Sequence, residues 1–335
     1  MTIDIFSWAD ISENFSDSIL IGNGASISID ESFRYGSLRQ HAIDNGLLTE
    51  DVEKIFGFFE TNDFELILRL VWQASRVNIA LNIEDNTTRQ AYQHVRDCLI
   101  NAVRSIHPEY FEVEDQFPII AAFLQKYKTI LSLNYDLTLY WVMMLANREY
   151  NGHRFKDCII NGQFDEDWGR FRNSISQAER EISLVFYPHG SLLLARNIVD
   201  REVKLECRNG NDLLRTILAD WESENFVPLF VSEGTSKQKK LAIRNSHYLN
   251  TIYREVIPSL SESIVVFGWG FSDHDIHILD RFKQSSIQRF AVSVHNNDQA
   301  YCTRVQQLIR DHVSHEMEVV FFDSESPGCW NQPAQ

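Results

Sequence analysis

The sequence predicts an α/β fold: a doubly wound, Rossmann-like parallel sheet of six to seven strands with a large helical insertion. Three observations predict it. Short apolar runs recur along the chain, these runs do not alternate with polar residues, and longer amphipathic stretches separate them. Such continuous runs are typical of parallel strands, because helices cover both faces of a parallel sheet. The 335 residues are enough for a large core.

The expected strands share one composition, in which β-branched or aromatic residues run with few polar breaks. They are residues 18–22, 129–134, 183–188, 227–232, 263–268, 290–295 and 317–322. Apolar residues at helical spacing follow several of these runs and predict helices at 137–146, 240–256, 276–282 and 298–312.

The helical insertion is expected between the first two strands. Little strand signal occurs there, and structureless loops of that length are rare. Apolar residues recur instead at helical spacing, for example Phe64, Leu68 and Val71. We therefore expect a core of residues 1–30 and 129–325, a helical subdomain at 31–128 and a flexible tail at 326–335. A second, polar insertion is expected at 150–181.

Composition excludes several classes of protein. The 31 Lys and Arg against 47 Asp and Glu give a net charge of −16, which opposes direct nucleic-acid binding. No apolar run is long enough to predict a membrane helix, and residues 1–20 lack the basic region of a signal peptide. Five cysteines without a CxxC pair argue against a structural zinc site. We expect a cytoplasmic protein with reduced thiols.

Two polar motifs stand at the ends of early strands. Gly22-Asn23-Gly24-Ala25-Ser26 follows the first strand, and a glycine turn there can admit a pyrophosphate, or can be a turn that binds no ligand. Asn134 and Asp136 end the second strand, where open α/β sheets bind their ligands. Asp136 could instead cap the next helix.

Two further motifs follow later strands. His189 and Gly190 stand in a Pro-His-Gly turn, which could aim an imidazole into a cleft or lie at the surface. The segment 268–275 contains Gly268, Trp269 and Ser272, then Asp-His-Asp. The glycines and the serine suit a ribose or phosphate. The acidic residues suit helix capping better than a metal, because no second cluster completes a coordination sphere. The polar turn 231–237 is expected near the same cleft.

Taken in order, these motifs resemble the sirtuin superfamily. The matching segments are Gly22-Asn23-Gly24-Ala25-Ser26, Ser132-Leu133-Asn134-Tyr135-Asp136, His189-Gly190 and Gly268 through Ser272. Protein-deacylating sirtuins carry two CxxC pairs after the His-Gly element, where residues 191–227 hold only Cys207. The chain therefore looks like the zinc-free, bacterial SIR2-like proteins with helical insertions, which act as NAD+ glycohydrolases in antiphage defence.

The resemblance implies roles for catalytic residues. Asn134 would orient water or the ribose hydroxyls, Asp136 would bind the nicotinamide carboxamide, and His189 would accept a proton. NAD+ is the implied substrate, and no metal is expected. The implied dinucleotide-binding residues are Gly22, Asn23, Gly24, Ala25, Ser26, Phe33, Gly190, Gly268, Trp269 and Ser272. Of these, the backbone at Gly22, Gly24 and Ala25 with the Ser26 hydroxyl would hold the pyrophosphate, and Phe33 with Arg34 would close over nicotinamide.

Two other functions stay open at this point. The same Asn and His would serve an NAD+-dependent protein deacylase, and the cleft could belong to an idle nucleotide-sensing module. The resemblance also implies an oligomer restrained by a partner, which could be a pyrophosphatase-like protein, a ring ATPase or a phage component.

Overall fold

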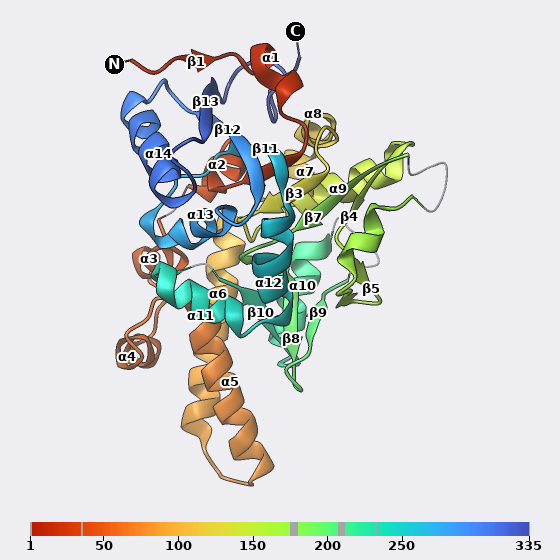
Figure 1. Cartoon of the computed structure of the whole chain (residues 1–335). Helices are drawn as coiled ribbons and strands as arrows, with labels where there is room; N and C mark the ends of the chain where they lie inside the picture. The colour runs from red at the N-terminus through yellow and green to blue at the C-terminus, as the bar shows by residue number, and fades with distance from the viewer. Residues whose placement is uncertain (1, 35, 175–179, 207–211, 232, 335) are drawn as a thin grey trace.

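The computed structural model describes residues 2–34, 36–174, 180–206, 212–231 and 233–334. Its central sheet has eight strands, all parallel, in the order β1-β13-β12-β11-β2-β3-β7-β4 (Figure 1). These strands are β1 (Ile5–Phe6), β2 (Ser18–Ile21), β3 (Thr129–Ser132), β4 (His153–Lys156), β7 (Glu181–Phe186), β11 (Ser261–Phe267), β12 (Ser286–Val294) and β13 (Glu318–Asp323). The predicted α/β, Rossmann-like fold is confirmed.

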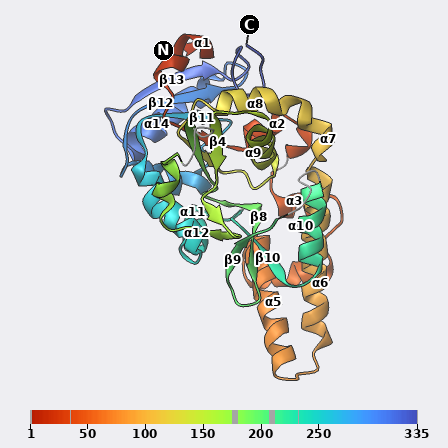
Figure 2. The same ribbon diagram turned by 90° about the vertical axis from the view of Figure 1, so that its right-hand side faces the viewer.

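The central strand β2 explains the continuous apolar runs. Ile19 lies opposite Ile130 of β3 on one side and Val265 of β11 on the other, and all three side chains are fully buried. Each such side chain contributes roughly 1.5–3 kcal/mol through burial. Helix α14 lies on one side of the sheet, and α8 and α9 lie on the other (Figure 2).

The sheet has eight strands rather than six to seven because both edges carry short strands. Six of the seven expected strands belong to it. At one edge β1 has two residues, and at the other β4 pairs with Glu181–Leu184 of β7 inside the segment expected to be a polar insertion. β1 has too few residues for a pattern, and β4 (His153–Lys156) alternates buried and half-buried residues, so neither forms a continuous apolar run.

The strand expected at 227–232 belongs to a different sheet. It forms β10 (Phe226–Phe230) and pairs antiparallel with β8 (Gly190–Asn197), which also pairs with β9 (Glu202–Lys204). Pro228 has no N–H to donate, so it fits the edge position that β10 occupies. The two-stranded hairpin of β5 (Ile159–Ile160) and β6 (Gln163–Phe164) lies outside both sheets.

The segment between β2 and β3 is helical, as expected. Two long antiparallel helices, capped by the side chains of Asp63 and Asp85, project from the body as a hairpin (Figure 1). The helices of this segment are α2 (Asn23–Ile27), α3 (Leu38–Asp44), α4 (Glu50–Phe58), α5 (Phe64–Ala80), α6 (Asn86–Ile106), α7 (Tyr110–Val113) and α8 (Phe117–Leu124).

The remaining helices are α1 (Trp8–Ile11), α9 (Thr138–Glu149), α10 (Leu213–Glu222), α11 (Ser236–Arg244), α12 (His247–Thr251), α13 (Ile276–Phe282) and α14 (Gln299–His312). The helix expected at 240–256 is divided, because Ser246 caps a new helix by accepting the Leu249 N–H, and a π-helical turn follows at Ile252–Val256. Within the described residues, no helix combines the length and apolar character needed to cross a bilayer.

The last residues differ from the flexible tail that we expected. Cys329 and Trp330 are buried, the Trp330 ring stacks on Phe267 at 5.5 Å, and its Nε1 donates to the carbonyl oxygen of Ala25 at 3.0 Å. The aromatic residue that the sequence places among prolines and glycine therefore anchors this segment beside α2.

The loops after β2 and β11 touch through their backbones. The Gly24 N–H donates to the Gly268 carbonyl oxygen at 2.7 Å, and Gly268 has a φ of +68°. A Cβ at Gly268 would lie 2.3 Å from the Ala25 nitrogen, whereas a Cβ at Gly270 would meet nothing within 4 Å. Glycine at 268 is required by both conformation and space.

We expect Gly268→Ala to destabilise the protein by about 2 kcal/mol or more, because it adds left-handed strain to overpacking. Gly270→Ala is the matched control and should leave the free energy of unfolding nearly unchanged. Urea denaturation measures both, and equal stability of the two variants would contradict the close contact.

Candidate functional site

A cleft of about 670 Å³ lies at the carboxyl ends of the central strands. The chain runs from β2 outward to β3 and β7, then returns to β11 on the opposite side of β2. The strand order thus reverses between β2 and β11, which is where open α/β sheets bind ligands. The cleft volume is within the usual range for small-molecule sites.

The cleft brings together residues that are far apart in the sequence. The expected site residues that line it are Gly22, Asn23, Asn134, Asp136, His189, Trp269 and Ser272. The turn after β10 contributes Val231, Glu233, Gly234 and Thr235, as the sequence predicted. Loops of the helical insertion add the segments at 36–38 and 60–62.

A hydrogen-bond chain holds the Asn134 amide. Its Nδ2 donates to the Gly22 carbonyl oxygen at 3.0 Å and to Ser26 Oγ at 2.8 Å, and Ser26 Oγ donates to Asp136 Oδ2 at 2.6 Å. Both amide hydrogens are therefore used inside the protein. The remaining group of Asn134 is the acceptor Oδ1, which can receive an O–H from water or a sugar.

Asp136 stands one residue before the N-cap position of α9, which is Leu137. Its Oδ1 accepts the Thr138 N–H at 2.8 Å, while Oδ2 accepts from Ser26 and the side chain lines the cleft. A carboxylate oxygen can accept two hydrogen bonds, so each oxygen keeps a lone pair.

The glycine loop is organised differently from the expected pyrophosphate site. The N–H groups of Gly22, Gly24 and Ala25 donate to the carbonyl oxygens of Phe267, Gly268 and Gly22, at 2.9, 2.7 and 3.0 Å. The first two donors join the loops after β2 and β11, and the third stays within the loop after β2. The expected roles of Gly24, Ala25 and Gly268 as ligand contacts are therefore wrong for this structure, and Ser26 acts by orienting Asn134.

Phe33 also lies away from the cleft. Its ring is 2% exposed and packs edge-on against His107 at 5.4 Å, and its carbonyl oxygen accepts from Asn23 Nδ2 at 3.1 Å. Arg34 pairs with Glu31 at the surface. The expectation that Phe33 and Arg34 close over a ligand is wrong here, because Phe33 is part of the core under the loop.

Gly190 has a structural role, since its φ is +79° and a Cβ would lie 2.2 Å from the Leu229 carbonyl oxygen. Trp269 does line the cleft, with its ring stacked on Phe271 and its buried Nε1 without a hydrogen-bond partner in the described structure. Ser272 caps the turn at Asp273–Asp275 by accepting the His274 N–H. The acidic residues of this segment were expected to cap a helix, but the side chain of Asp275, the N-cap residue of α13, makes no capping hydrogen bond. The cap that the structure shows is the serine.

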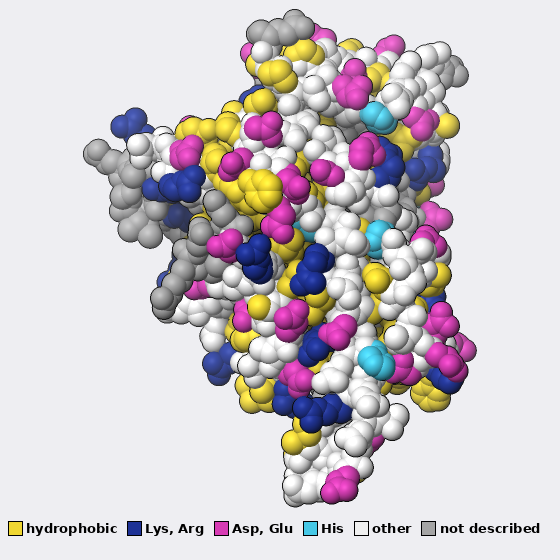
Figure 3. Space-filling model, turned by 180° about the vertical axis from the view of Figure 1, so that it is seen from behind, with side chains coloured by type: hydrophobic (Ala, Val, Ile, Leu, Met, Phe, Trp, Pro, Cys, Tyr) yellow, Lys and Arg dark blue, Asp and Glu magenta, His cyan; other side chains and the backbone are white. Residues whose placement is uncertain are grey.

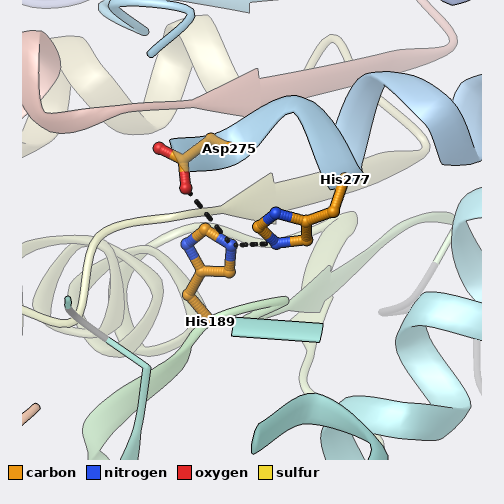
Figure 4. A group of neighbouring side chains, drawn as sticks. All are labelled: His189, Asp275 and His277. Atoms are coloured by element: carbon orange, nitrogen blue, oxygen red, sulfur yellow. Dashed lines mark hydrogen bonds and ion pairs between the residues drawn. The ribbon is translucent and has the colours of Figure 1, made fainter. Parts of the chain in front are cut away.

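His189 meets two residues that the sequence analysis did not connect with it (Figure 4). Its Nε2 lies 3.0 Å from Nε2 of His277 and 3.9 Å from Asp275 Oδ1. Burial lowers the pKa of His189 well below its usual value and lowers the pKa of His277 to about 4, although Asp275 opposes both shifts. Both imidazoles are therefore neutral near pH 7, and His189 can accept a proton.

Among the described residues, the same three side chains form the group that could hold a metal ion, because one ligand atom from each lies within 4.8 Å of the others. However, the buried Lys239 ammonium already binds Asp275 Oδ1 at 2.8 Å, and it lowers the pKa of His189 by repelling positive charge. A divalent cation would meet this repulsion together with the attraction of the Asp275 carboxylate. The expectation that the protein binds no metal stays a prediction.

Glu233 adds a titrating group to the lining of the cleft. Its Oε1 accepts the Arg39 N–H at 3.1 Å, while its buried Oε2 has no hydrogen-bond partner among the described residues. Burial raises the pKa of Glu233 to about 7, and nearby Asp63 raises it further. This carboxyl group therefore changes its charge near neutral pH.

Sequence reasoning missed His277, Lys239 and Glu233 as site residues. His277 lies within a predicted helix, where the sequence does not show which face is buried, and Lys239 lies between the predicted turn 231–237 and the predicted helix 240–256. Glu233 stands in a turn that was expected near the cleft, but its raised pKa depends on burial by the helical insertion.

A family model described as a domain of unknown function (DUF4917) matches residues 19–330. A search of curated proteins finds no significant match.

We expect Ser26→Ala to lower the free energy of unfolding by about 1–3 kcal/mol, because Asn134 and Asp136 each lose a buried partner. Ser28→Ala is the matched control, since Ser28 is exposed and its hydroxyl donates to the nearby Ala25 carbonyl oxygen. Chemical denaturation measures both. A loss no larger than that of the control would show that the chain does not hold Asn134.

Glu233→Gln should change how stability depends on pH. The folded pKa of about 7 lies above the usual 4.5, so the wild type binds an extra proton when folded and loses stability as pH rises between these values. The variant lacks this loss, and its stability relative to wild type should rise by about 1–3 kcal/mol from pH 5 to pH 8. Glu60→Gln, at an exposed lining position, should run parallel to wild type in the same urea series.

Proposed function

The chain belongs to the DUF4917 family, and from its cleft we propose that it is an NAD+ glycohydrolase, which cleaves NAD+ to nicotinamide and ADP-ribose. One observation carries the proposal. Asn134 and His189, which are separated in the sequence by α9 and the strands β4 to β7, line the same cleft at the reversal point of the sheet. A hydrogen-bond acceptor and a neutral base on one cavity suit the activation of water at a sugar carbon.

The reaction depends more on the positioning of the substrate and water than on a strong acid or base. The C–N glycosidic bond breaks, its electron pair goes to the nicotinamide nitrogen, and the positive charge passes to an oxocarbenium-like ribose. Water forms the new C–O bond and releases one proton. The Asn134 Oδ1 can accept a hydrogen bond from this water or from a ribose hydroxyl, and neutral His189 can take the proton.

Asp136 would serve at the nicotinamide end. The remaining lone pairs of its carboxylate can accept the carboxamide N–H, and its negative charge favours the positively charged ring and the developing oxocarbenium ion. The proposal gives no role in pyrophosphate binding to the N–H groups of Gly22, Gly24 and Ala25, because these groups are bonded inside the protein.

The proposed biological role is that of a cytoplasmic antiphage effector which a partner restrains. A free NAD+ hydrolase would exhaust its own cell, so the lone chain requires control by assembly or by a second protein. The tip of the α5–α6 hairpin offers apolar side chains to such a contact, since Val77, Ile79, Leu81 and Ile83 are all more than half exposed. Acidic and basic side chains are interspersed over the face shown in Figure 3, which suits a protein partner.

The proposal predicts that purified protein releases nicotinamide and ADP-ribose from NAD+, alone or once proteins encoded beside its gene are added. We expect Asn134→Ala to reduce this release by about 10²-fold or more, because the oriented acceptor is lost. Chromatography follows both products, and calorimetry measures NAD+ binding separately. Asn101→Ala, at an exposed position on α6, is the matched control and should keep full activity.

Other outcomes distinguish the remaining functions. Formation of O-acyl-ADP-ribose from an acylated peptide would favour the deacylase. NAD+ binding without turnover under all activating conditions would favour the nucleotide-sensing module. If NAD+ does not bind at all, the cleft has been assigned to the wrong ligand.

A further inference from the structure

His277 is the buried residue that forms a hydrogen bond with His189. Its side chain is fully buried, it comes from α13, and it approaches His189 from the side opposite to Nδ1 (Figure 4). The two Nε2 atoms are 3.0 Å apart and the rings are nearly parallel, with 28° between their planes. Two neutral imidazoles in this contact must share one hydrogen, so one Nε2 donates and the other accepts.

The surroundings of the two rings indicate which one donates. Asp275 Oδ1 lies 3.9 Å from His189 Nε2, and its negative charge favours a hydrogen on that nitrogen. On the other ring, His277 Nδ1 lies 3.4 Å from Ser236 Oγ. The carboxylate beside His189 therefore favours His189 as the donor and His277 as the acceptor.

We infer that His277 is a positioning residue, which accepts the N–H of His189 Nε2 and thereby keeps His189 Nδ1 unprotonated and available as the base. A neutral imidazole carries a single N–H, so a hydrogen fixed on Nε2 leaves Nδ1 bare. The catalytic role of His189 in this inference rests on the proposed function. The tautomer of His189 can be tested independently of that function.

The step balances without a further group. The water that attacks the ribose gives its proton to His189 Nδ1, its oxygen keeps the new bond to carbon, and His189 becomes an imidazolium. The imidazolium keeps its Nε2–H bond to His277, and Asp275, with its Oδ1 at 3.9 Å, balances the charge. Release of the Nδ1 proton to solvent restores the neutral pair.

Two substitutions separate tautomer control from packing. His277→Leu fills similar space but cannot accept a hydrogen bond, whereas His277→Gln supplies a carbonyl oxygen that can accept the same N–H. We expect His277→Leu to lower kcat on the order of 10²–10⁴-fold with little change in the Kd for NAD+. His277→Gln should stay within about tenfold of wild type, which is the cost of one weakened hydrogen bond.

Nitrogen-15 spectra of the histidine rings in the full chain provide a readout that does not depend on turnover. In the wild type, His189 should show a protonated Nε2 and a bare Nδ1, and in His277→Leu the hydrogen should move toward Nδ1. A wild-type His189 that is protonated at Nδ1 would overturn the inference. So would equal kcat values for the Leu and Gln variants.

Added Zn²⁺ tests the competing arrangement. Stoichiometric binding that shifts the Nε2 signals of both rings would make the pair a metal site and overturn the inference, whereas unchanged spectra support it. If the protein never cleaves NAD+ but His189 has the inferred tautomer, the proposed function fails while the assignment of His277 stands.

Discussion

The candidate site depends on one hydrogen-bond chain that joins the carboxyl ends of β2 and β3. Asn134 donates to the Gly22 carbonyl oxygen and to Ser26, and Ser26 donates to Asp136. All four residues are buried, so each bond is formed away from competing water and each lost partner would leave a costly polar group. The chain fixes the orientation of the Asn134 amide, and with it the one acceptor that the amide can offer to a ligand.

The glycines of the Gly-x-Gly turn after β2 have a structural role in this protein. A Gly-x-Gly turn after a strand is usually discussed as a way to let a ligand approach the backbone. Here the approaching group is another loop of the same protein, because Gly24 and Gly268 are hydrogen-bonded through their backbones and neither leaves room for a Cβ. The contact joins the loops after β2 and β11 at the point where the strand order reverses, and the cleft lies beside that contact.

The sequence predicted the fold well where one signal was sufficient. Buried parallel strands such as β2, β3 and β11 need continuous apolar runs, so they could be found, and the insertion could be recognised from helical spacing. Short edge strands such as β4 carry too little signal. The place of β10 depends on its partner, which is non-local information. His189 could be selected from its turn, but its contact with His277 joins β8 to α13 and exists only in the folded chain.

The environment of His189 limits the chemistry that it can perform. Burial keeps it neutral and therefore able to accept a proton, but the same burial makes it a weak base. A weak base is poorly suited to removing a proton from an unactivated ribose hydroxyl, whose oxygen holds its hydrogen strongly. Water that is already bonding to an oxocarbenium carbon becomes acidic as the bond forms, so a weak base suffices to take its proton. In the proposed hydrolysis, a base whose pKa is lowered by burial is sufficient, because the cationic leaving group supplies most of the driving force.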